Sequence, residues 1–291
     1  MRPFRVGIFS LALSSLSPLY APAQSSFVTL GGPLAQWKKE IEQKSQGKLV
    51  AVRVYTDPLR NELVLPEDTP ERAVLRRYFL EESFRALFVD AHSLSVNYSG
   101  TEGKFHCVLL NMARADQWGG FEEAVLADEF GHAWLAALGY GTPVFMPGDR
   151  SCLHVHASDA LQHLLIRREL TRRNISHLDF WRHSLDFSLQ KMESGATQSP
   201  QPKPPCQRLA QLALLLDVRL SLSPQLWKNF ERFQQLLSKL SPEILPAAED
   251  LEKRLRQLQP TPSSPLPDHK AYLDTLDYLL DKFAELYDAK P

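Results

Sequence analysis

Three ionisable residues lie close together in the most hydrophobic helical segment of the chain, residues 122–140 (EEAVLADEFGHAWLAALGY). In a helix, His132 lies about 40° around the axis from Asp128 and Glu129 lies about 100° from it, so the three share one arc. The surrounding side chains, among them Phe130 and Trp134, are apolar and are predicted to be buried. A carboxylate buried without a partner costs on the order of several kcal/mol, so we expect a metal, a proton or a cation beside these carboxylates.

The frame VLADEFGHAWLAALG resembles the metal-binding helix of the zincin metallopeptidases, whose motif is HExxH. In that family two histidines one turn apart hold zinc, and the glutamate takes a proton from water. The resemblance implies that His132 is a zinc ligand and that Glu129 is the general base. Asp128 stands in the place of the first histidine. Its oxygen can ligate zinc, but its negative charge weakens the Lewis acid, so a slower enzyme is expected.

A third ligand is expected from the polar residues that follow this helix. The candidates are His154, His156 and His163, together with Asp159. In zincins with a glutamate as third ligand, that residue lies some twenty or more positions past the second histidine. His156 follows His132 by 24 residues, whereas the chain has no glutamate at this distance.

Other interpretations of the same residues stay open. Asp128 and Glu129 could pair with Arg114 or Arg150, and His132 could be a hydrogen-bonded core histidine. The second hypothesis for function is therefore a catalytically inactive zincin-like scaffold that binds a protein or peptide along the former cleft. A di-iron carboxylate bundle is excluded because there is no second ExxH, and no GxSxG or Gly-rich phosphate loop is present.

The elements before the central helix predict an α+β fold, with helices on one face of a small, mostly antiparallel sheet. Alternating β-branched residues indicate a strand at 49–55, with 62–65 as its hairpin partner, and the turn at 99–103 separates two further strands at 94–98 and 105–111. Helices are expected at 34–48, which Gly47 ends, and at 70–88, which an N-cap and a proline open. This order is similar to the N-terminal lobe of zincins over residues 49–170. By that resemblance, FHCVLLNM would be the edge strand that lines the substrate cleft.

The rest of the chain is predicted to be helical. We expect helices from about Ser158 and over 174–192, and then a Pro/Gln/Ser linker at 194–205. Leucines at helical spacing then predict a helical bundle with a supporting role, at 206–222, 224–240, 242–258 and 268–289. The predicted domains are a zincin-like α+β domain at 24–193 and a helical C-terminal region at 206–291.

Residues 1–23 have the pattern of a signal peptide, with Arg2 and Arg5, an apolar stretch and a small-x-small site at residues 21–23. The protein is therefore expected to be exported, to the periplasm or the medium, with no membrane-spanning segment in the mature chain. Three cysteines allow one disulfide at most. A net charge of −1 gives no support for nucleic-acid binding. A peptide or protein is the expected substrate or partner.

Overall fold

The structure is a computed structural model of the 291-residue chain. It describes residues 26–57, 62–64, 75, 88, 91–101, 103–118, 120–141, 151–196, 204–258, 260 and 265–289. The predicted signal peptide lies outside these residues. The predicted helix at 70–88 also lies outside them except for Leu75 and Phe88, which are helical and buried.

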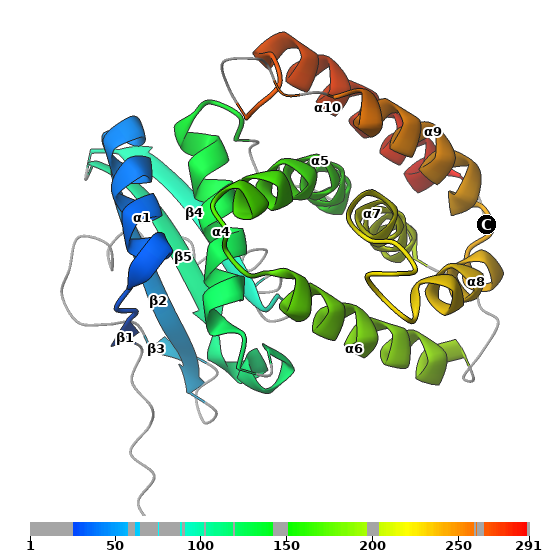
Figure 1. The fold of residues 1–291 in the computed structure, drawn as a ribbon, viewed down its shortest axis with the longest axis horizontal. Coiled ribbons are helices and arrows are strands. Elements are labelled where there is room, and N and C mark those ends of the chain that lie inside the picture. The colour runs from blue at the N-terminus through cyan, green and yellow to red at the C-terminus, as the bar shows by residue number, and fades with distance from the viewer. Residues whose placement is uncertain are drawn as a thin grey trace, which may run out of the picture.

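A small mixed sheet forms one side of the molecule (Figure 1). Its strands are β1 (Ser26–Phe27), β2 (Lys48–Asp57), β3 (Glu62–Val64), β4 (Ser93–Gly100) and β5 (Gly103–Asn111), in the order β1-β2-β5-β4 with β3 paired to β2. The pairs β1–β2, β2–β3 and β4–β5 are antiparallel, whereas β2 and β5 run parallel. The predicted α+β class is confirmed, and the sheet is mixed because its central pair is parallel.

The prediction that FHCVLLNM forms an edge strand is wrong. β5 lies between β2 and β4, and its residues from Phe105 to Asn111 are all buried. A continuous apolar run of this kind is typical of a strand covered on both faces. β4 is the strand at this end of the described sheet, and most of its residues are only partly buried or exposed.

The two faces of the sheet are covered by different parts of the chain. Leu49 and Ala51 of β2 point towards α1 (Gly32–Ser45) and α4 (Glu122–Ala137). The alternate residues Val50, Val52 and Val54 point to the opposite face. This alternation follows from the two-residue period of a strand. Leu75 and Phe88 belong to the cluster on the opposite face. α4 therefore lies with one side on the sheet and its other side free to meet further helices.

The helical half of the molecule packs against that other side of α4 (Figure 1). A short 3-10 helix, η1 (Met112–Trp118), leads from β5 to α4. The later helices are α5 (Ser151–Arg172), α6 (Leu178–Ala196), α7 (Pro205–Ser221), α8 (Phe230–Leu240), α9 (Ile244–Gln257) and α10 (His269–Asp288). The predicted helical C-terminal region is confirmed over the residues that the structure describes.

The prediction that the second long helix starts near Ser158 is wrong by seven residues, because α5 starts at Ser151. The buried positions Leu153, Ala157 and Leu161 recur every four residues from the first turn onwards. The apolar period of the helix therefore begins before Ser158, and His154 and His156 lie within α5 instead of preceding it.

One continuous hydrophobic core joins the sheet-side helices to the C-terminal helices. Trp37, Phe130, Leu215 and Phe283 are fully buried members of the same cluster. Within the described part of the chain, no helix combines the length and hydrophobicity needed to cross a membrane. The division into two domains at residues 194–205 stays a prediction.

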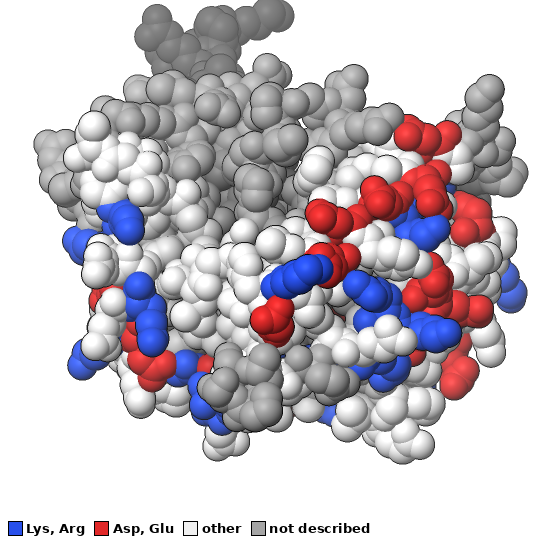
Figure 2. Space-filling view, turned by 90° about the horizontal axis from the view of Figure 1, so that it is seen from above, with Lys and Arg blue, Asp and Glu red and all other residues white. Residues whose placement is uncertain are grey.

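Acidic residues gather over α9 and α10, interleaved with lysines and arginines, on the face shown at the right of Figure 2. Several of these charges pair within one helix, as Lys270 does with Asp274 and Arg256 does with Glu252. Exposed pairs at this spacing contribute little to stability because water screens them. This surface is therefore a solvated face of paired charges.

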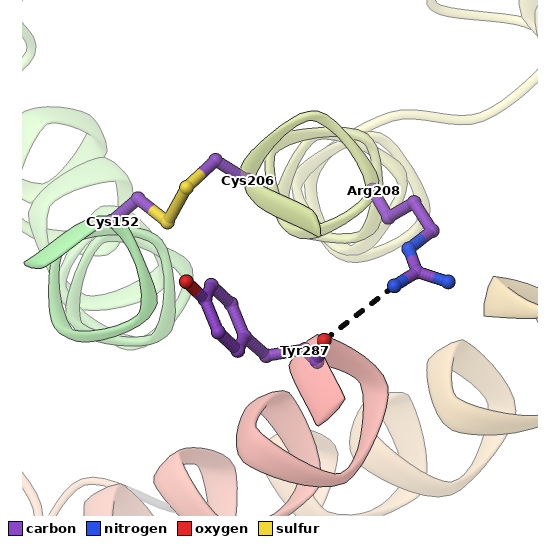
Figure 3. The surroundings of a disulfide bond; sticks show 4 residues. All are labelled: Cys152, Cys206, Arg208 and Tyr287. Carbon is purple, nitrogen blue, oxygen red and sulfur yellow. Dashed lines mark hydrogen bonds between the residues drawn. A yellow bond between two sulfur atoms is a disulfide. The ribbon is translucent and has the colours of Figure 1, made fainter. Parts of the chain in front are cut away.

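A disulfide between Cys152 and Cys206 joins the first turns of α5 and α7, with Cα atoms 5.7 Å apart. Figure 3 shows the bond beside the end of α10, where Arg208 donates hydrogen bonds to the carbonyls of Tyr287 and Ala289. The third cysteine, Cys107, is buried in β5 outside this bond. The expectation of at most one disulfide is confirmed.

The disulfide closes a loop of 54 residues, so its loss should destabilise the fold. We expect the double variant Cys152→Ser, Cys206→Ser to lose about 2–4 kcal/mol of unfolding free energy, because the unfolded chain regains the entropy of an open loop. Urea denaturation should give this difference, and wild-type protein treated with reductant should match the variant. Equal stability of oxidised and reduced wild type would contradict the prediction.

Candidate metal centre

Asp128 and His132 on α4 meet His163 on α5. One ligand atom from each of these three side chains lies within 4.8 Å of the other two. The rings of His132 and His163 have centroids 5.3 Å apart, and His163 Nε2 lies 3.7 Å from Asp128 Oδ2. All three residues are half-buried. Two imidazoles and a carboxylate in this arrangement could hold a metal ion.

Both imidazoles are held through Nδ1. His163 Nδ1 lies 3.1 Å from Asp217 Oδ2, and His132 Nδ1 lies 2.7 Å from Gln162 Oε1. An ionised carboxylate only accepts hydrogen bonds, and Gln162 uses its Nε2 to donate to the carbonyl of Tyr140. Each Nδ1 is therefore the donor, and Nε2 is the nitrogen left to bind a metal. Metal-binding histidines commonly show this second hydrogen bond.

Asp217 on α7 is the buried acid behind His163. Arg167 holds its carboxylate with two hydrogen bonds of 2.9 and 3.0 Å and also donates to Ser221. Burial alone would raise the pKa of Asp217, but Arg167 and His163 outweigh this effect and lower the pKa to about 2. Asp217 is therefore a carboxylate, and so a hydrogen-bond acceptor, at any pH at which the protein works.

The carboxylates around His163 favour positive charge at this point of the molecule. Burial alone would lower the pKa of His163, but Asp217 and Asp128 outweigh it and raise that pKa to about 9. The same field that stabilises a proton on the ring stabilises a cation bound to its Nε2. A proton and a metal ion therefore compete for His163.

A chain of hydrogen bonds connects His132 through Gln162 and Tyr140 to the C-terminal helix α10. Gln162 is buried, and the Tyr140 carbonyl that accepts from it also accepts a hydrogen bond of 2.6 Å from the Tyr272 hydroxyl. Burial raises the pKa of Tyr272 to about 12, so this hydroxyl stays a donor. α10 thus helps to fix the turn after α4, which in turn fixes Gln162 and the His132 ring.

Glu129 lies on the side of α4 that faces β4. Its side chain is only 7% exposed, and Ser93 Oγ on β4 donates a hydrogen bond of 2.6 Å to it. Burial raises the pKa of Glu129 to about 7, against smaller opposing effects of His132 and Ser93. An acid with this pKa can take up and release a proton near neutral pH. Glu129 is adjacent to the candidate ligands but is not one of them.

Gly131, the fourth residue of DEFGH, allows α4 and α5 to approach closely. A Cβ at this position would lie 2.4 Å from Ile166 Cγ2, and Ile166 is fully buried. Only a residue without a side chain fits this contact. The close approach brings His163 within reach of Asp128 and His132.

The structure brings together three of the predicted ligands and leaves two apart. Among the described residues, the group of candidate ligands contains His163 but neither His154 nor His156. His156 precedes His163 by seven residues, which is about 10 Å along a helix, so the two cannot serve the same ion. The alternative prediction is that Asp128 and Glu129 pair with nearby arginines. Instead, Asp128 pairs with His163, and Glu129 accepts a hydrogen bond from Ser93. Arg150, one of the candidate arginines, lies outside the described residues.

Sequence reasoning missed the residues that orient the two histidines, Asp217 and Gln162. One signal for Asp217 was available, because it is the only acidic residue in the apolar helix at 205–221. No comparable signal marked Gln162, since a glutamine on a helix is ordinary.

Comparison with known proteins adds no assignment: no family model matches the chain, and neither a curated protein nor a solved structure matches it. The site is therefore interpreted from its own geometry.

The raised pKa of Glu129 predicts a pH-dependent cost of burial. A carboxyl whose pKa is about 7 in the folded protein, against 4.5 for an ordinary one, stabilises the fold below pH 4.5 and loses that contribution as the pH rises through 7. Glu129→Gln should therefore match wild type at pH 4 and be more stable at pH 8, by on the order of 2–3 kcal/mol. Urea denaturation at both values tests this, with exposed Glu123→Gln as the control. A constant difference across the range would refute it.

Loss of the Asp217 charge should destabilise the α5–α7 contact. Asp217→Asn leaves Arg167 buried without its counter-charge, and breaking a buried pair in this way costs about 3–5 kcal/mol. The matched control is Asp179→Asn, which removes an exposed partner of Arg182 and should cost less than about 1 kcal/mol. Chemical denaturation at neutral pH compares the two variants. Similar losses in both would show that the buried pair contributes no more than a surface pair.

Proposed function

We propose that this chain is an exported, zinc-dependent hydrolase that acts on peptide or protein substrates through a zincin-like site. The observation that carries the proposal is the meeting of Asp128, His132 and His163, with both imidazoles held through Nδ1. The ExxH spacing of Glu129 and His132 agrees with the resemblance to zincins. In this proposal His163 takes the role of third ligand.

The donor set supports zinc as the metal. Catalytic zinc is commonly bound by two imidazole nitrogens and one carboxylate oxygen, with a further position left for substrate or water. When bound, zinc would supply Lewis-acid polarisation of water and of the scissile carbonyl. Asp217 and Gln162 would hold the two histidines in place for it. The carboxylate of Asp128 would reduce that polarisation, so a low rate is expected.

Glu129 is the residue proposed to move the proton. Its pKa of about 7 suits a group that accepts a proton from the attacking water and then passes it to the leaving amine. The hydrogen bond from Ser93 holds Oε1 at the first residue of β4. β4 is the last strand of the described sheet on this side, and an extended peptide added along it would pass Glu129.

The disulfide supports the proposal of export. Bonds such as Cys152–Cys206 persist in oxidising compartments, including the periplasm and the medium. This agrees with the signal-peptide pattern at residues 1–23.

A second candidate function is an inactive zincin-like scaffold that binds a peptide or protein partner. Two observations favour it. Asp128 replaces a histidine ligand, and Glu129 is buried and bonded to Ser93 rather than directed at the ligand group. In that case Glu129 is a buried, hydrogen-bonded carboxyl between α4 and β4 and takes no part in a reaction.

Zinc titration of chelator-treated protein tests the metal site. Wild type should bind one equivalent of zinc, and His132→Ala or His163→Ala should weaken binding at least about tenfold, a loss of about 1.4 kcal/mol or more. His154→Ala is the matched control, since His154 lies on α5 outside the ligand group. Asp128→His should bind zinc more tightly by restoring HExxH. Absence of zinc binding in both wild type and Asp128→His would overturn the proposal.

Peptide cleavage separates the two candidate functions. If the chain is a hydrolase, zinc-loaded wild type should cleave a mixed peptide library, and Glu129→Gln should abolish cleavage while zinc binding is kept. Zinc binding without cleavage by wild type would instead support the inactive scaffold.

A further inference from the structure

A second pocket opens beside the helical bundle, between α5, the start of α6, the end of α7 and α9. Its volume is about 630 Å³, which lies within the range of about 300–1,000 Å³ typical of small-molecule sites. None of the three candidate metal ligands lines it. The pocket is therefore separate from the proposed hydrolase site.

Three arginines line the pocket, and none of its described lining residues is acidic. Two of the three have a carboxylate partner outside the pocket. Arg167 is held by the buried carboxylate of Asp217, and Arg256 is paired with Glu252, which Arg219 also approaches. Arg168 is the lining arginine for which the described residues provide no carboxylate partner.

Arg168 is half-buried and donates one hydrogen bond, of 2.8 Å, to the carbonyl of Leu258. Within the described part of the chain, no carboxylate pairs with it. Burial lowers its pKa, and no acid offsets that effect. A guanidinium has five N–H donors in a planar fork that matches a carboxylate. An anion in the pocket would therefore supply the counter-charge that the protein does not.

The remaining walls of the pocket are largely hydrophobic. Leu164, Leu178, Leu220 and Leu226 come from four different segments around it. Leu226 is 41% exposed, which is unusual for a leucine in this protein, where most are buried. A hydrocarbon body laid on these side chains would remove that apolar surface from water.

We propose that this pocket binds a small organic monocarboxylate with an apolar body, its carboxylate on Arg168 and its hydrocarbon on the four leucines. The planar fork of one guanidinium without a carboxylate partner matches one carboxylate. A phosphate monoester, which carries about −1.5 to −2 at neutral pH, would bring more negative charge than one guanidinium balances.

Calorimetric titration of the full chain with octanoate tests the proposal. Wild type should show saturable binding, and Arg168→Met, which keeps the length of the side chain and removes its charge, should weaken it at least about tenfold. Arg182→Met is the control, because Arg182 is a partly exposed arginine outside the pocket. Octan-1-ol should bind at least tenfold more weakly than octanoate, since it lacks the charge, and acetate should do so because it lacks the body.

A second variant covers the case in which Arg168→Met does not fold. Leu226→Asp changes an exposed wall residue, so the fold should tolerate it, and the added carboxylate should abolish octanoate binding. The proposal fails if wild type shows no saturable binding, if folded Arg168→Met binds octanoate as tightly as wild type, or if Leu226→Asp does. It also fails if acetate, octan-1-ol or inorganic phosphate binds as tightly as octanoate.

Discussion

The buried carboxylate of Asp217 makes the polar contact that holds α5 and α7 together inside the helical region. It accepts two hydrogen bonds from Arg167 and one from His163, and so ties α7 to α5. The same contact sets the orientation of a candidate metal ligand. It is also the carboxylate partner of Arg167, whereas Arg168 in the second pocket has no such partner among the described residues. A single acid in an apolar helix thus links the stability of the bundle to two sites of different chemistry.

Negative charge and burial both act on the titratable groups at the candidate metal centre. Asp217 and Asp128 raise the pKa of His163, whereas the pKa of Glu129 is raised chiefly by its burial. Both shifts reduce the net charge inside the protein. A divalent cation would meet the same need at one point, and this is the physical reason for proposing zinc there. A histidine at position 128 would supply a ligand with less negative charge, which is the chemical difference between this site and HExxH.

α4 positions the candidate site residues on two of its sides. One side lies on the sheet, where Glu129 meets Ser93 of β4, and the other side meets α5, where Asp128 and His132 face His163. Gly131 stands between the charged positions and permits the close contact with Ile166. A residue far along the chain also helps to position the site. Tyr272 on α10 donates a hydrogen bond to the carbonyl of Tyr140, which also accepts from Gln162.

The amino-acid sequence is sufficient to predict features that depend on the local period of the chain. It placed Asp128 and His132 on one arc because a helix repeats every 3.6 residues, and it identified the strand at 49–55 by the alternation of its β-branched residues. It could not choose among His154, His156 and His163, because all three lie on one helix and only the packing of α4 on α5 decides which faces the ligands. Strand order was equally out of reach, since pairing β2 with β5 in parallel joins segments more than fifty residues apart. Asp217, 54 residues from its partner His163, became part of the site only through tertiary contact.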